Sequence, residues 1–401
     1  MSDSPVPMPD WPMPRTCPYA PPDQYAELRQ GPPVKVRVGG GEAWLVTRHE
    51  QVRAVLTDDR FSSDDQLPGF PVRVQLPPEP KVMSFFRMDD PEHGRLRRMA
   101  QTEFTARRTR ALRPAVDALV ERLLDGIAAG PRPVDIVREY ALALPALVIA
   151  RLFGVPEEDQ SEFTARSETI LTPDADPNEV YGAFVAMTEY LNRLVTERER
   201  RPQDDLLSRL ATRYVVTGEL THEDLVAMAR LFLVAGHETT AHQIALSVLS
   251  LLRAPDQLAE LRDRPELYPQ AVEEALRYWS IAQDNQVRVA VGDVELGGAA
   301  IAKGDGVILA LPAANHDERV FAHPGRFDIH RDAGRHIAFG YGAHLCPGAP
   351  LARMEIAVAL EGLFTRFPSL RLAGYADDGA DVPFRPRHTI VYGLDALYVT
   401  W

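Results

Sequence analysis

The residues best suited to chemistry include two histidines and a glutamate on an apolar run, LVAGHETTAHQ at positions 233–243. In the zinc-protease pattern HExxH the histidines are four residues apart, so both rings lie on one face of a helix. His237 and His242 are five residues apart, which rotates the second ring by ~140° around a helix. This geometry argues against a zinc site. Local hydrogen bonding inside a buried helix is the simpler interpretation.

A second candidate is Cys346, which lies in FGYGAHLCPG at positions 339–348. It follows a glycine-rich loop and directly precedes a helix expected to begin near Pro347. The helix dipole and unpaired N–H groups would then lower the pKa of its thiol. One anionic sulfur in such a loop suits the iron of a haem. A buried structural cysteine and a nucleophilic cysteine with a histidine base remain alternatives.

The elements that must position these residues are mostly helical. A capping arrangement at Thr221 begins a helix that runs to about 252 and, at ~1.5 Å per residue, would cross the molecule. The segments 34–38 and 43–47 predict an antiparallel hairpin. Helical periodicity covers most of 91–200, and further helices are expected at about 268–279 and 347–366, with short strands between them. We therefore expect a mainly α protein with minor β-sheets.

Composition limits the classes of function. The net charge of -13 over 401 residues argues against general binding to nucleic acid or an anionic membrane surface. Two cysteines cannot build a disulfide framework, which favours a reducing cytoplasm. The most apolar window, 225–252, contains charged residues and is a poor membrane span. We expect an extended N-terminal tail at 1–20, a single domain at 21–401, and a monomer.

Several blocks together resemble the cytochromes P450, the haem-thiolate monooxygenases. The cysteine loop matches the family signature F-G-x-G-x-H-x-C-x-G, and EALR at 274–277 resembles the family's E-x-x-R. LVAGHETT resembles the distal-helix signature [AG]-G-x-[DE]-T-[TS], and DPEHGRLRR at 90–98 resembles H-x-x-x-R. The blocks occur in the family's order between residues 90 and 355. A chance match to all of them is negligible, so we expect the cytochrome P450 fold.

The resemblance implies a role for each matching residue. Cys346 would be the axial ligand of the iron of heme b, iron protoporphyrin IX, and Thr239 with Glu238 would deliver protons to the oxygen site. Gly236 would leave room for dioxygen, and Glu274 with Arg277 would form a buried structural ion pair. The remaining haem contacts, which include the cationic partners of the propionates, would be His93, Arg97, Ala235, Arg288, His336, Phe339, Gly340, His344 and Gly348, with a similar close approach at Gly342.

The resemblance also implies the reaction. The protein would activate O2 with two electrons and oxidise, most simply hydroxylate, a small-molecule natural product in secondary metabolism. Oxidative C–C or C–N coupling of aromatic or peptide-like substrates is an alternative. A haem sensor without turnover is another, and the intact Glu238–Thr239 pair argues against it. A cysteine hydrolase is disfavoured because no oriented base is evident.

Partners and substrate contacts follow from the same comparison. The chain has no flavin or nucleotide motif, so ferredoxin and ferredoxin reductase would supply the electrons. An arginine-rich patch would dock the acidic ferredoxin; its members are Arg95, Arg97, Arg98, Arg107, Arg108 and Arg110. The polar stretch IAQDNQV indicates a substrate with hydrogen-bonding groups. The expected substrate contacts are Phe86, Ala235, Gln283, Asp284, Val287 and Ile390.

Overall fold

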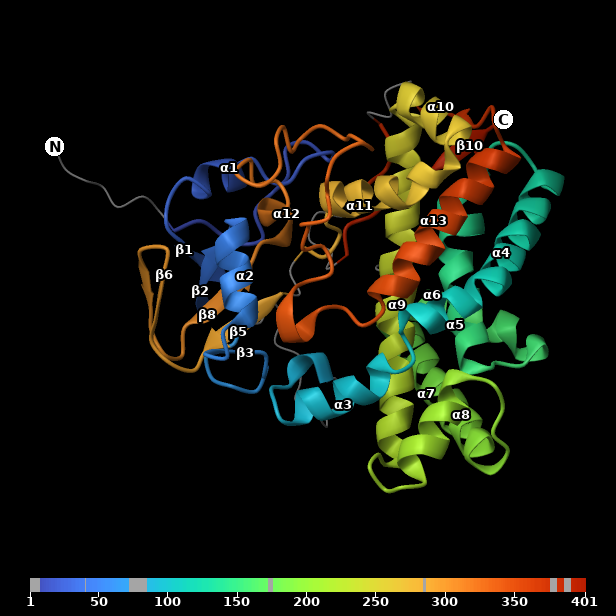
Figure 1. The fold of residues 1–401 in the computed structure, drawn as a ribbon, viewed down its shortest axis with the longest axis horizontal. Coiled ribbons are helices and arrows are strands. Elements are labelled where there is room, and N and C mark those ends of the chain that lie inside the picture. The colour runs from blue at the N-terminus through green and yellow to red at the C-terminus, as the bar shows by residue number, and fades with distance from the viewer. Residues whose placement is uncertain are drawn as a thin grey trace.

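The computed structural model describes residues 8–39, 41–71, 85–171, 176–283, 286–375, 381–385 and 391–401. Figure 1 shows two regions, a large group of helices around the long helix α9 and a smaller region of strands that carries α2. The expectation of a mainly α protein with minor β-sheets is confirmed. Two expected substrate residues, Asp284 and Ile390, lie outside the described residues.

Helix α9 (His222–Leu252) is the central element and has the predicted bounds. Its start is fixed by a capping box in which the Thr221 hydroxyl accepts from the Asp224 N–H at 3.0 Å and the Asp224 carboxylate accepts from the Thr221 N–H at 3.2 Å. Its apolar residues are distributed all around the axis, which is typical of a helix that packs against neighbours on several sides. It packs against α5 (Ala143–Phe153), α7 (Pro177–Arg200), α11 (Tyr268–Trp279) and α13 (Ala349–Arg366).

The main sheet runs in the order β1-β2-β8-β5-β3 within the described residues. The predicted antiparallel hairpin is confirmed, with Val36 opposite Ala43. Strand β8 then pairs with β2 in parallel and with β5 antiparallel. The strands of the main sheet are β1 (Val34–Val38), β2 (Gly41–Val46), β3 (Phe61–Ser62), β5 (Val287–Ala290) and β8 (Gly306–Leu309). A second sheet contains β4 (Val134–Asp135), β9 (Arg371–Leu372) and β10 (Tyr398–Thr400). A third contains β6 (Val294–Leu296) and β7 (Ala299–Ile301).

The remaining helices surround these elements. Short 3-10 or π turns are η1 (Phe85–Arg87), η2 (Val137–Leu142), η3 (Glu157–Asp159), η4 (Ala211–Val215), η5 (Pro265–Leu267) and η6 (Gly342–His344). The other α-helices are α1 (Gln24–Leu28), α2 (His49–Thr57), α3 (Glu92–Gln101), α4 (Ala106–Ala129), α6 (Gln160–Leu171), α8 (Leu206–Leu210), α10 (Pro255–Asp263) and α12 (Leu311–Ala314).

Residues 8–20 were expected to be part of an extended tail, and positions 9–13 of this segment lie along the sheet. The Trp11 N–H donates to the Arg37 carbonyl at 2.9 Å, and the Arg37 N–H donates to the Pro9 carbonyl at 2.9 Å. The Trp11 and Met13 side chains are buried in the cluster that covers this sheet. This segment is therefore held by both backbone hydrogen bonds and apolar burial.

No helix among the described residues is both long enough and apolar enough to cross a membrane.

Candidate active site

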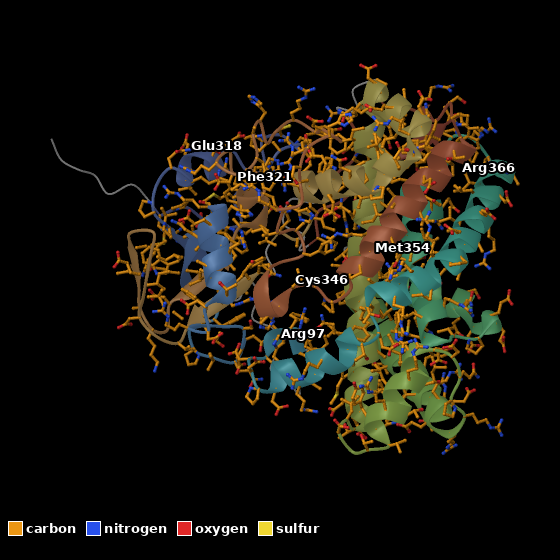
Figure 2. The ribbon with its side chains drawn as sticks, viewed as in Figure 1. Arg97, Glu318, Phe321, Cys346, Met354 and Arg366 are labelled. Carbon is orange, nitrogen blue, oxygen red and sulfur yellow. The ribbon has the colours of Figure 1, made fainter. Side chains whose placement is uncertain are left out.

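Cys346 lies between the η6 turn and helix α13, at the point where the sheet region meets the helical region (Figure 2). Its N–H donates to the Phe339 carbonyl at 2.9 Å, and its carbonyl accepts from the Ala349 N–H at 3.3 Å. Because residues 346–349 form a turn, α13 begins at Ala349 rather than near Pro347 as expected. The loop holds the sulfur at the N-terminus of the helix without making it part of the helix.

The electrostatic environment of the Cys346 sulfur is mixed. Burial raises the pKa of the Cys346 thiol above its ordinary value, while the N–H groups of Gly348 and Ala349 and the Arg97 guanidinium act in the opposite direction. The expectation that the helix N-terminus lowers this pKa is therefore wrong in its net result, because burial outweighs the dipole. A metal ion bound to the sulfur would reverse the balance, since a coordinating thiol loses its proton.

Backbone conformation and close packing explain why glycine occupies positions 340 and 342 of this loop. Gly340 and Gly342 have φ of 75° and 70°, in the left-handed region that favours glycine. A Cβ on Gly342 would lie 2.5 Å from the Leu56 carbonyl oxygen, so this glycine lets the loop contact α2. A Cβ on Gly348 would lie 3.9 Å from the Cys346 sulfur, which is an ordinary contact. Phe339 lies next to Arg353, whose guanidinium carbon is 4.7 Å from the ring centroid.

Two imidazole rings stack close to this loop. The His93 and His344 ring centroids are 3.9 Å apart with planes inclined by 21°. His344 Nε2 is 3.2 Å from the Ser63 hydroxyl, and His93 Nδ1 is 3.5 Å from an Asp90 carboxylate oxygen. The second nitrogens, His93 Nε2 and His344 Nδ1, are buried and have no hydrogen-bond partner in the described part of the chain. Two buried ring nitrogens without a protein partner, side by side, are available to hydrogen-bond a ligand.

Arginines surround the same two rings. Burial lowers the pKa of His344 to about 3, and the charges of His93, Arg288, Arg97 and Arg87 add to the effect. Burial, together with Arg87, also lowers the pKa of Arg288 to about 10. The buried Arg288 guanidinium and the half-buried guanidinium groups of Arg87 and Arg97 form a cationic cluster that an anion would stabilise. The residues present therefore fit the two carboxylates of a haem, next to a sulfur that can bind its iron.

Arg87 did not emerge from the sequence. It lies in η1 with its guanidinium carbon 5.2 Å from the ring centroids of both Phe70 and Phe86. It precedes His93 by six residues and belongs to none of the recognised motifs. The one sequence feature that could have indicated Arg87 is its place directly after Phe85 and Phe86, shortly before the segment at 90–98.

His336 lies away from this cluster. Its Nε2 is 3.0 Å from a Glu273 carboxylate oxygen, and its Nδ1 accepts from the Ala338 N–H at 3.1 Å. Glu273 also accepts from Arg353 at 2.6 Å. Both ring nitrogens of His336 are thus engaged, and this placement differs from the expected contact with a propionate.

The expected oxygen site is the middle of α9. The Thr239 hydroxyl donates to the Ala235 carbonyl at 2.7 Å, and both residues lie on one face four positions apart. Val234 and Ala235 are exposed on this helix. A Cβ on Gly236 would lie 3.3 Å from Ile149 Cδ1 of α5, so this glycine also permits close packing of the two helices. Its expected role of leaving room for dioxygen stays a prediction.

The polar neighbours of Thr239 have separate partners. His237 Nδ1 lies 2.7 Å from the Ser167 hydroxyl of α6, and its Nε2 lies 2.9 Å from the Leu142 carbonyl. Burial lowers the pKa of His237 to about 4, so the ring is neutral and acts as a structural link. Glu238 forms an ion pair with Arg385, a residue that no sequence motif indicated.

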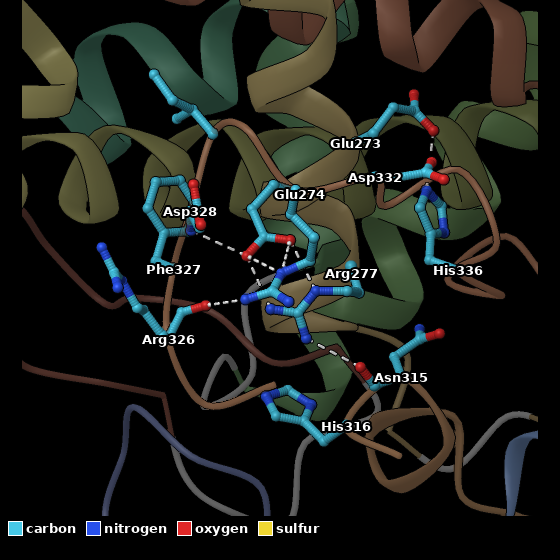
Figure 3. A network of polar contacts seen from close by, with 12 residues as sticks. Glu273, Glu274, Arg277, Asn315, His316, Arg326, Phe327, Asp328, Asp332 and His336 are labelled. Atoms are coloured by element: carbon cyan, nitrogen blue, oxygen red, sulfur yellow. Dashed lines mark hydrogen bonds and ion pairs between the residues drawn. The ribbon is translucent and has the colours of Figure 1, made fainter. Parts of the chain in front are cut away.

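The Glu274–Arg277 pair is fully buried in α11 (Figure 3). Arg277 donates to the two carboxylate oxygens of Glu274 at 2.7 and 2.8 Å, and also to the Asn315 carbonyl at 2.9 Å. The carboxylate accepts two further bonds, from Arg331 at 3.1 Å and from the Asp328 N–H at 3.0 Å. Glu274 is therefore the centre of a network, and Arg331 is a member that the sequence did not reveal.

Four of the expected substrate residues lie in the described part of the chain, and one of them, Ala235, is exposed on α9. Phe86 is 44% exposed. Gln283 is instead held by Arg15, which donates to its side-chain oxygen at 2.8 Å, and by the Ser280 carbonyl at 3.0 Å. Val287 is 4% exposed and packs in the apolar cluster on the main sheet, and its expected contact with the substrate stays a prediction.

Comparison with known proteins adds to this geometry. The family model described as Cytochrome P450 matches residues 21–371. Cytochrome P450-SU2 of Streptomyces griseolus is 45% identical, over 96% of this chain and 94% of the relative. Mycinamicin VIII C21 methyl hydroxylase of Micromonospora griseorubida is 44% identical, over 98% of this chain and 99% of the relative. The crystal structure of cytochrome P450 MoxA from Nonomuraea recticatena superposes with a TM-score of 0.92 at 42% identity, covering 98% of each chain.

Proposed function

This chain belongs to the cytochrome P450 family and is a monooxygenase of that family, and we propose that it hydroxylates a small-molecule natural product in secondary metabolism. The observation that carries the proposal is the joint placement of Cys346, the stacked His93 and His344 rings, and the arginines around them. The relative that acts on the C21 methyl group of mycinamicin VIII supports a natural-product substrate. Oxidative coupling of aromatic or peptide-like compounds is the second candidate from the sequence. The hydroxylase among the relatives favours the first.

The family's cofactor is a haem iron, and we assign heme b. Bound there, the haem would supply the iron that activates dioxygen. The Cys346 sulfur would hold the iron, and Phe339 would shield that side from water. The propionates would accept hydrogen bonds from His93, Arg97, Arg288 and His344, and we add Arg87 to this set because its charge acts on the same groups.

Proton delivery is assigned to Thr239 and Glu238. The Thr239 hydroxyl lies on the same face of α9 as the exposed Ala235, whose carbonyl accepts its hydrogen, and rotation of the hydroxyl would turn that hydrogen toward the oxygen site. We expect Thr239→Ala to lower the product formed per NADPH by roughly an order of magnitude and to release hydrogen peroxide in its place. The assay uses a substrate found by spectral titration of a natural-product library.

Thr239→Ser is the matched control, because it keeps the hydroxyl and removes only a methyl group. It should couple NADPH to product nearly as the unmodified enzyme does. Unchanged coupling in Thr239→Ala would show that another group delivers the protons.

We also propose that ferredoxin, reduced by ferredoxin reductase, docks on the side of the arginine-rich patch, and that the protein works in the cytoplasm. Arg97 donates to the Leu345 carbonyl next to the cysteine, and Arg98 and Arg107 are exposed. Arg95 and Arg108 form ion pairs with Glu92 and Glu103, which partly compensates their charge. The uncompensated arginines of this patch would attract an acidic partner.

The rate of haem reduction by ferredoxin should therefore fall as ionic strength rises. At low salt, Arg98→Gln should be reduced more slowly than the unmodified protein. Arg366→Gln is the control, since Arg366 lies toward the far end of α13 from Cys346 and Arg97 (Figure 2). Stopped-flow measurement of the haem reduction rate gives both the salt dependence and the effect of each variant. A rate independent of salt would contradict this docking site.

A further inference from the structure

Arg15 is a buried arginine in the N-terminal segment that precedes α1, and it is 4% exposed. Its Nη1 donates to the Ala20 carbonyl at 2.6 Å, and its Nη2 donates to the Gln283 side-chain oxygen at 2.8 Å. Its guanidinium carbon lies 4.0 Å from the centroid of the Tyr392 ring. One side chain from the start of the chain therefore contacts two segments that are distant from it and from each other in the sequence.

The two segments that Arg15 contacts are also joined to each other. The Tyr392 N–H donates to the Ile281 carbonyl at 2.8 Å, next to an antiparallel bridge between the same two segments. The expected substrate contact Gln283 belongs to the first segment, and the expected contact Ile390 precedes the second. Arg15 thus lies where two expected parts of the substrate site are held together.

Residues 18 and 19 attach the N-terminal segment to the same place. The Tyr392 hydroxyl donates to the Pro18 carbonyl at 2.6 Å. The Tyr19 ring meets the Phe384 ring edge-on, with centroids 5.2 Å apart. On its other side, the guanidinium carbon of Arg253, at the end of α9, lies 3.6 Å from the Tyr19 centroid. The backbone that carries Arg15 is therefore fixed by contacts that do not depend on Arg15 itself.

The partners of Arg15 indicate orientation more than stability. Both of its hydrogen-bond acceptors are neutral oxygens, and burial lowers the pKa of its guanidinium. Burying a charge is costly, and an apolar side chain of similar length would fill the space without that cost. A guanidinium group differs from such a chain in having donors in fixed directions and a flat face that stacks on an aromatic ring. It can therefore fix the Gln283 side chain relative to the Tyr392 ring.

We propose that Arg15 is a positioning residue for substrate recognition. The segment 9–20, held on the sheet at Trp11, acts as a brace that sets the placement of residues 281–283 against residues 391–393. Ligands large enough to reach these residues bind well only when the brace is in place, whereas small ligands bind equally well without it. This inference rests on the proposed function, because the substrate contacts of the two segments come from it.

The test compares two azoles, imidazole and the bulky clotrimazole, in absorption titrations of the haem-loaded enzyme. Both bind iron through an azole nitrogen, but only clotrimazole is large enough to contact the surrounding protein. Arg15→Met removes the charge and the donors and keeps a side chain of similar length. We expect it to raise the Kd of clotrimazole roughly tenfold and to change the Kd of imidazole by less than about twofold.

Turnover of a substrate found by spectral titration gives a second readout. Arg15→Met should raise KM roughly tenfold and leave kcat at saturation within about twofold, because the lost contact acts on binding and not on the reacting atoms. Tyr392→Phe keeps the ring under Arg15 and loses only the bond to Pro18. It should raise the Kd of clotrimazole roughly threefold.

Two further variants separate positioning from stability. Arg29→Met is the matched control, since Arg29 is another buried arginine near the N-terminus and donates to the Ala313 carbonyl at 3.2 Å. It should leave both Kd values unchanged, even if it lowers the unfolding midpoint. Arg15→Lys keeps the charge next to Tyr392 but loses the planar fork that serves two acceptors, so its Kd for clotrimazole should lie between those of Arg15→Met and the unmodified protein.

The contrary results are distinct. Arg15 has no positioning role if Arg15→Met binds clotrimazole as tightly as the unmodified protein, or if the Kd of imidazole rises by the same factor. An equal loss in Arg29→Met would assign the effect to general stability and would overturn the inference as well. If Arg15→Met does not fold, an unchanged Kd in both Tyr392→Phe and Arg15→Lys has the same meaning. If imidazole produces no absorption shift in the unmodified protein, the proposed haem site fails first.

Discussion

Cys346→Ser is expected to abolish the red-shifted absorption band that a thiolate-ligated haem gives when reduced and treated with carbon monoxide, and turnover should be lost with it. The serine hydroxyl fits the same space between Phe339 and the start of α13. It stays protonated, however, and cannot provide the anionic sulfur that donates electron density to iron. Absorption spectra of the two purified proteins measure the change directly.

Cys17→Ser is the matched control for this experiment, because Cys17 is the other cysteine of the chain and is exposed. It should leave the band and the turnover intact. A red-shifted band that survives in Cys346→Ser would assign the iron ligand to another residue. A normal band without turnover in the unmodified protein would instead favour the sensor alternative.

The second large effect is expected at the buried network of α11. Glu274→Gln removes the one carboxylate that accepts from both Arg277 and Arg331, so it leaves two buried or half-buried cations without their anion. Arg277→Met leaves Glu274 with Arg331 still in place. Breaking a buried pair typically costs about 3–5 kcal/mol, and we expect Glu274→Gln to reach this range while Arg277→Met costs less.

Denaturant unfolding of the two variants, with haem content measured by absorbance, tests this order. Glu260→Gln is the control, because Glu260 pairs with Arg264 at 3.0 Å on an exposed part of α10. Loss of an exposed pair should change the free energy of unfolding by less than about 1 kcal/mol. A Glu274→Gln variant as stable as this control would mean that the network does not hold the fold together.

Local sequence signals predicted the framework well. The capping box at Thr221 fixed the start of α9, and the period of apolar residues gave the bounds of α11. The spacing of Glu274 and Arg277 placed them on one face of one helix. Such features depend on residues within about four positions of each other, where helix geometry alone decides which side chains are neighbours. The cysteine loop was equally visible because its glycines and its cysteine are contiguous.

Contacts between distant segments could not be predicted in this way. Arg385 reaches Glu238 across 147 positions of sequence, and Arg15 reaches Gln283 across 268. Neither arginine carries a local pattern that names its partner. His336 likewise joined Glu273, 63 positions away, and not the haem site. Several arginines could pair with a given carboxylate, and the tertiary fold decides which of them lies close enough to do so.

Burial was the other quantity that required the folded structure. Short-range features indicated that Cys346 lies at the start of a helix, but the net pKa of its thiol depends on how completely the surrounding segments exclude water from the sulfur. Similarly, the sequence placed Gly236 in α9, and only the packing of α5 showed that Ile149 occupies the space beside it. Residue types and short spacings thus predicted the cofactor site and, through the family resemblance, the reaction class. Desolvation and long-range contacts, which sum over the whole fold, decide how each group there is held.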